Sequence, residues 1–76
     1  MNDIETIKRK TVKSIVKHKG KIYKLNRCLD NLPMAKVYAN SIYIEYKDIK
    51  IIKIENENNY CVYVSKKRIN PDIIYG

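Results

Sequence analysis

The stretch from Ile42 to Ser65 constrains the fold most, because it is the densest run of β-branched and aromatic residues in the chain. Within it, Ile49–Ile54 carries apolar side chains on both faces of an extended strand, and Tyr60–Ser65 alternates two sets of side chains. The polar residues 55–59 between the two runs are typical of a hairpin loop. The stretch therefore predicts a β-hairpin that is covered on both of its faces.

A second period-two pattern precedes this hairpin. Ile42, Ile44 and Tyr46 recur at every second position, as in a half-buried strand. We expect a strand here that either turns at Lys47-Asp48 or continues through a bulge as one bent strand to Ile54. The expected core positions of these strands are Ile44, Ile52, Val62 and Val64.

The N-terminal segment allows two interpretations. As a helix, it has a capping-box pattern at Asn2 and Glu5 and a glycine, Gly20, at its end. As strands, it forms a hairpin of Thr11–His18 with Lys21–Cys28 that turns at Gly20. We prefer the hairpin, because β-branched residues lose rotamer freedom in helices and the return strand follows at once. A single helical turn over Ile4–Arg9 can precede it.

Residues 29–40 are the least regular part of the chain. Asp30-Asn31 and Pro33 predict a turn or loop, and the apolar residues at 34, 35 and 37–39 suit either a short helix or a short strand. The 76 residues suffice for one small domain, spanning 1–76. The expected fold is mainly β: a small curved antiparallel sheet or a five-stranded barrel of the SH3-like or OB-like kind.

Cys28 and Cys61 are the only cysteines, and they lack the CxxC spacing of metal sites. Both lie in or beside apolar strand sequence, so we expect two buried free thiols in a reducing compartment, with a disulfide as the alternative. The N-terminus has no apolar signal-peptide core, and no apolar run approaches the ~18 residues that span a bilayer. The sequence predicts a cytoplasmic protein without membrane contact.

The positive charge is concentrated at one end of the chain. The formal net charge is +8, and residues 1–27 hold nine Lys and Arg against two acids. Residues 28–76 are nearly balanced, with seven basic and six acidic side chains. This asymmetry favours an anionic partner for the first third of the chain, although a solvated basic surface is the simpler explanation.

The basic residues of the predicted N-terminal hairpin surround one aromatic ring, Tyr23, which suggests phosphate contacts beside a stacking platform. A basic run near the C-terminus can extend this surface, because chain ends of small domains often lie close together. The candidate nucleic-acid-binding residues are Lys13, Lys17, Lys19, Lys21, Tyr23, Lys24, Arg27, Lys66, Lys67 and Arg68. Lys outnumbers Arg thirteen to three, so the binding should be directed to the backbone and only weakly sequence-specific.

Catalysis is not expected. The single histidine, His18, lies in a basic stretch without a neighbouring acid, so we interpret it as a surface turn residue. Glu45 and Asp48 lie among lysines, which indicates surface ion pairs rather than a metal site. With two glycines in the chain there is no phosphate-cradling loop. We therefore predict a non-enzymatic protein that needs no cofactor and no metal.

The sequence thus predicts a small basic domain that binds DNA or RNA. The alternative is a protein-interaction module, or an accessory or inhibitor protein of a mobile element, that binds an acidic protein surface. In that case Tyr43 and Tyr63 are the expected anchors, unless their rings simply cover the second side of the sheet. An exposed edge strand also allows a homodimer.

Overall fold

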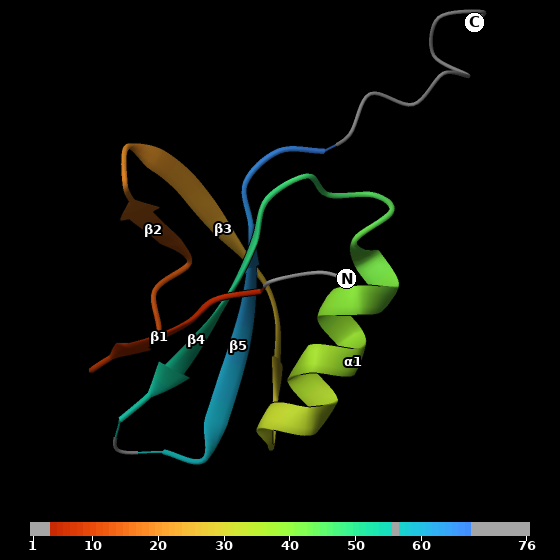
Figure 1. Cartoon of the computed structure of the whole chain (residues 1–76). Helices are drawn as coiled ribbons and strands as arrows, with labels where there is room; N and C mark the ends of the chain where they lie inside the picture. The colour runs from red at the N-terminus through yellow and green to blue at the C-terminus, as the bar shows by residue number, and fades with distance from the viewer. Residues whose placement is uncertain (1–3, 56, 68–76) are drawn as a thin grey trace, which may run out of the picture.

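The β-branched runs of the sequence build a curled sheet, which a helix covers in part (Figure 1). The computed structural model describes residues 4–55 and 57–67. The elements in this part of the chain are β1 (Thr6–Arg9), β2 (Ile15–His18), β3 (Lys21–Leu29), α1 (Leu32–Ile42), β4 (Ile49–Ile54) and β5 (Asn59–Val64). The order of the strands across the sheet is β1-β4-β5-β3-β2. The prediction of a small, mainly β fold with a strongly curved sheet is confirmed.

The predicted central hairpin is confirmed as β4 and β5, which pair antiparallel from Ile49↔Val64 to Ile54↔Asn59. Both faces of this hairpin are largely buried, as the apolar side chains on both faces of Ile49–Ile54 predict. On one face Ile51 and Val62 pack against α1. On the other face the sheet curls over itself and encloses a second core cluster. Its fully or nearly fully buried members are Val16, Tyr23, Ile52, Ile54, Cys61 and Tyr63.

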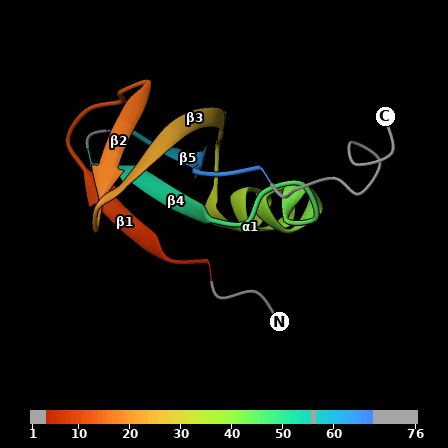
Figure 2. The ribbon, with the colours of Figure 1, turned by 90° about the horizontal axis from the view of Figure 1, so that it is seen from above.

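The sheet curls into a half-barrel whose two edge strands, β1 and β2, lie at the end of the molecule away from α1 (Figures 1 and 2). β1 pairs parallel with β4, so the sheet is mixed and not purely antiparallel as expected. The predicted helical turn over Ile4–Arg9 is wrong for the same reason. The edge of β4 offers this segment backbone hydrogen bonds, such as Ile51 N–H to the Glu5 carbonyl at 3.0 Å, and a strand uses them where a helix cannot.

The predicted N-terminal hairpin exists as β2 and β3, but β2 begins at Ile15 and not at Thr11. Lys19 and Gly20 form a two-residue turn, with φ values of 50° and 80°. Positive φ at both positions matches the type I′ turn that suits the twist of a β-hairpin. Gly20 adopts this conformation without strain because it has no Cβ.

The irregular segment after residue 29 starts a helix. Asn31 is its N-cap: the side-chain Oδ1 accepts a hydrogen bond from the Met34 N–H at 2.9 Å, and Pro33 occupies the first turn. Ala35 and Ala39, four residues apart, are fully buried against the sheet. Small side chains at this spacing let the helix approach the sheet closely.

The predicted strand from Ile42 to Tyr46 is wrong. Ile42 ends α1 and packs on the core, residues 43–45 form a turn, and Tyr46 makes an isolated bridge to Lys67. Ile44, which we placed in the core, is 79% exposed. The period-two pattern was misleading because Ile42 belongs to the helix and Ile44 to the turn that follows it. Ile52, Val62 and Val64 are buried as predicted.

The prediction of two free cysteine thiols is wrong. Cys28 of β3 and Cys61 of β5 are paired directly across the two strands, and they form a disulfide. Free buried thiols were expected because both residues lie in strand sequence, but only the pairing of β3 with β5 brings them together. The bond lies beyond the bulge between Leu25 and Arg27, and it links two central strands of the sheet.

Candidate nucleic-acid interface

The open side of the half-barrel forms a basic cleft of about 420 Å³ between the end of β1 and the start of β2. Five cations line this cleft, all on exposed residues, and together they are named the basic seam here. They are Lys8, Arg9, Lys10, Lys13 and Lys17. The described residues of the cleft include one carboxylate, Glu55. The cleft therefore concentrates positive charge on two walls of a concave surface, where an anion gains from several cations at once.

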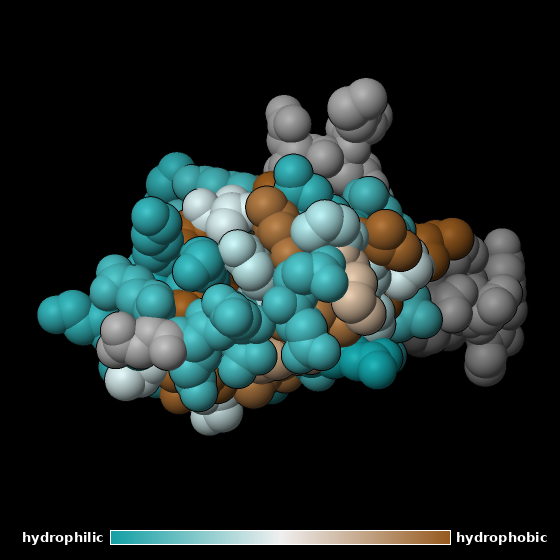
Figure 3. All heavy atoms as spheres, turned by 90° about the horizontal axis from the view of Figure 1, so that it is seen from below, coloured by the Kyte–Doolittle hydropathy of each residue, from teal (hydrophilic) through white to brown (hydrophobic). Residues whose placement is uncertain are grey.

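The surface view agrees with this arrangement. In Figure 3, hydrophilic side chains cover most of the left end of the molecule, where β1 and β2 lie in Figure 2, and hydrophobic atoms are more frequent toward α1. Five of the nine cations of the first third of the chain line the cleft at this end of the fold.

A buried tyrosine fixes the connection between β1 and β2. The ring of Tyr63 is fully buried in the core, and its hydroxyl donates a hydrogen bond to the Lys13 carbonyl and accepts one from the Lys13 N–H at 3.3 Å. This contact joins residues that are 50 positions apart in sequence. The wall of the basic seam that carries Lys10 and Lys13 is therefore anchored to β5.

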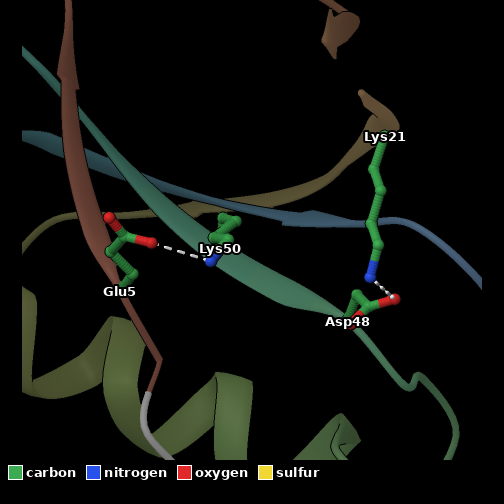
Figure 4. A network of polar contacts seen from close by, with 4 residues as sticks. All are labelled: Glu5, Lys21, Asp48 and Lys50. Carbon is green, nitrogen blue, oxygen red and sulfur yellow. Dashed lines mark hydrogen bonds and ion pairs between the residues drawn. The ribbon is translucent and has the colours of Figure 1, made fainter. Parts of the chain in front are cut away.

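Two other lysines form ion pairs with carboxylates that lie far from them in the sequence (Figure 4). Lys50 Nζ lies 2.8 Å from Glu5 Oε1, which joins β4 to the residue before β1, and Lys21 Nζ lies 3.0 Å from Asp48 Oδ2. The hydrogen bond from Lys50 and its charge hold the pKa of Glu5 below its usual value. The hydrogen bond to Asp48 and its charge raise the pKa of Lys21. Asp48 thus forms an ion pair, as the sequence indicated.

The predicted site residues separate into several places. Lys13 and Lys17 belong to the basic seam, whereas Lys21, Lys24 and Lys66 line a second groove together with Lys47. Lys66 thus lies beside residues of the hairpin, in a groove that shares no lining residue with the cleft. Lys19 is in the hairpin turn, and Lys67 is exposed beside its bridge to Tyr46. Arg68 lies outside the described residues.

Four of the aromatic or basic candidates make contacts within the fold. Tyr23, the expected stacking platform, is 4% exposed and belongs to the core, so that prediction is wrong. Tyr63 is buried and cannot anchor a partner, and Tyr43 is half-buried against the core on the helix side. The Arg27 guanidinium lies over the Tyr38 ring, 5.4 Å from its centroid, at the side of an apolar groove beneath α1. Tyr residues fill the core because the chain has no Phe or Trp.

The sequence reasoning missed Lys8, Arg9 and Lys10. These residues are the only three consecutive cations of the N-terminal half, which was a signal in itself. They were left out because the segment was expected to be a helical turn beside the hairpin and not a strand of the same sheet.

His18 differs from its expected position as a surface turn residue. It ends β2, it is half-buried, and its Nε2 is enclosed without a hydrogen-bond partner in the described part of the chain. Among residues 4–55 and 57–67, no group of three His, Cys, Asp or Glu side chains lies close enough together to hold a metal ion. The same residues contain no helix with the length and apolar character needed to cross a membrane.

Comparison with known proteins found no family model, no curated protein and no solved structure that matches this chain. The site is therefore interpreted from its own residues.

Proposed function

We propose that this protein is a small non-enzymatic nucleic-acid-binding domain that holds the phosphate backbone in its basic seam. The observation that carries the proposal is the convergence of five exposed cations on one cleft with a single carboxylate among its described residues. Phosphates are regularly spaced anions, and a concave row of cations can neutralise several of them together.

The chemistry of the seam supports low sequence specificity. Four of the five cations are lysines, whose ammonium groups are point charges without the planar fork that reads guanine edges. Tyr23, the ring expected among the cations, is in the core, so the contribution from stacking that we anticipated for single strands falls away. The binding we propose is therefore directed to the backbone and nearly equal for different sequences.

The test is a salt titration of binding to a short duplex and to the corresponding single strand, with DNA and RNA versions of both. Neutralising about five phosphates predicts a slope of roughly −4.5 for log K against log salt on duplex DNA. Replacing Lys10, Lys13 and Lys17 together with Ala should bring the slope to roughly −2. Affinity should fall by a similar factor for every sequence, because backbone contacts carry no base information.

The second groove provides the matched control. Replacing Lys24, Lys47 and Lys66 with Ala removes the same charge from exposed residues outside the cleft. If the slope of log K against log salt falls as far in this variant as in the seam variant, the binding follows net charge and the cleft is not the site. If none of the four nucleic acids binds near physiological salt, the proposal fails.

We also propose that the protein acts in the cytoplasm, although the Cys28–Cys61 bond removes one ground for that expectation. Disulfides persist in oxidising compartments and are uncommon in the cytosol. A cytoplasmic role therefore requires that the fold survives with both thiols reduced. The intact mass of freshly isolated protein, compared with its mass after reduction, decides which form the cell contains.

A further inference from the structure

The outer face of the β2–β3 hairpin combines two features, of which the proposed function uses Lys17 alone. Residues 15, 17, 22 and 24 are exposed and alternate in sequence with the buried Val16 and Tyr23. The register places Ile15 opposite Lys24 and Lys17 opposite Ile22. The result is a chequerboard of two isoleucines, 55% and 57% exposed, and two lysines on one strand pair.

β2 is also an edge strand. Within residues 4–55 and 57–67 it is the last strand of the sheet and pairs with β3 alone. The Leu25 N–H donates to the Ser14 carbonyl at 2.8 Å, so by alternation the backbone groups of Val16 also face β3. The N–H and C=O groups of Ile15 and Lys17 then point away from β3, to the side of β2 that has no partner strand among the described residues and that borders the basic seam. Four backbone groups are thus in position to pair with an added strand.

The charge around β2 determines which kind of strand can pair with its free edge. Lys17 on the edge strand and Lys24 on the neighbouring strand β3 repel a second copy of a chain whose net charge is +8. They attract a strand that carries carboxylates. We propose that β2 accepts an extended acidic segment of a partner protein, which adds to the sheet as an antiparallel strand.

The register predicts the sequence of that segment. Residues paired across two strands share a face, so the residue opposite Lys17 is acidic and the residue opposite Ile15 is apolar. The residue between them pairs with Val16, which lines the basic seam, so a second acid is favoured there. The recognised pattern is acid–acid–apolar, read from the N-terminus of the added strand. This inference does not depend on nucleic-acid binding, although Ile15, Val16 and Lys17 also line the basic seam.

The test uses a synthetic capped peptide, Thr-Glu-Glu-Ile-Thr, and the whole protein, with no nucleic acid present. The amide protons of Ile15 and Lys17 should become protected from hydrogen exchange on binding. Methylating the backbone nitrogens of the first Glu and the Ile, which pair with Lys17 and Ile15, should weaken binding roughly tenfold or more. The methylated peptide has the same charge as the original peptide. A loss of affinity on methylation therefore reports strand pairing and not attraction between charges.

Charge reversal tests the register. Lys17→Glu should weaken binding, and a peptide with Lys in place of its first Glu should restore it. Lys36→Glu is the matched control, because Lys36 is an exposed lysine on α1, and it should leave the affinity for the original peptide unchanged within about twofold. Absence of peptide binding, or binding that ignores N-methylation and leaves both amides unprotected, overturns the proposal. So does protection of these amides in concentrated protein without peptide, together with a dimer in sedimentation, because a second copy then occupies the edge.

Discussion

The Cys28–Cys61 bond should contribute a large share of the stability of this small fold. The bond closes a loop between residues 33 positions apart. In the chain-entropy model such a crosslink destabilises the unfolded state by about 3–4 kcal/mol. A domain of 76 residues has a total free energy of unfolding of roughly 4–11 kcal/mol. Removing the crosslink should therefore take away between about a quarter and nearly all of that free energy.

Cys28→Ala is the suitable variant, because Cys28 is exposed whereas Cys61 is fully buried and a change there would also leave a cavity. Urea unfolding is the assay. With a slope of about 1–2 kcal/mol per molar urea, the midpoint should fall by roughly 2–4 M relative to the oxidised protein. The wild type in excess reductant should unfold at nearly the same urea concentration as the variant.

The control is the variant itself in reductant, whose midpoint should not move. The reasoning is refuted if Cys28→Ala unfolds at the same urea concentration as the oxidised wild type, with an equal slope. Residual structure in the unfolded chain would then already keep the segments of β3 and β5 together, and the crosslink would restrict the chain no further.

Three further predictions concern individual side chains. Val62→Ala should cost about 1–3 kcal/mol in urea unfolding, since Val62 is fully buried beneath α1; a loss near zero would mean that the helix collapses onto the gap. Tyr63→Phe should cost about 1–2 kcal/mol and raise hydrogen exchange at the Lys13 amide, because the two hydrogen bonds to that backbone are lost; unchanged exchange at Lys13 would contradict the anchoring role. The Glu5–Lys50 pair lowers the pKa of Glu5, so its contribution to stability is present above the unfolded pKa of Glu5 and is lost as pH falls through the folded value. Glu5→Gln should therefore differ from the wild type in thermal unfolding at neutral pH and converge with it in acid, and a difference independent of pH would exclude the ion pair as its cause.

The strands were predictable where one local pattern had one interpretation. The apolar run Ile49–Ile54 and the alternation of Tyr60–Ser65 fit a doubly covered hairpin, and the turn at Gly20 follows from a residue that accepts positive φ. The basic character of the N-terminal third was also evident, because charge is a property of the residues themselves.

The remaining features depend on contacts between distant residues. A segment such as Thr6–Arg9 becomes a strand because the edge of β4 is free beside it, and Ile44 is exposed because α1 ends just before it. The disulfide and the basic seam have the same origin. Cys28 meets Cys61 across paired strands, and Lys8 meets Lys17 across a cleft, since a curled sheet brings its two edges to the same end of the fold. Local sequence determines which residues favour strands and carry charge, whereas the long-range pairing of the strands decides which of these residues become neighbours.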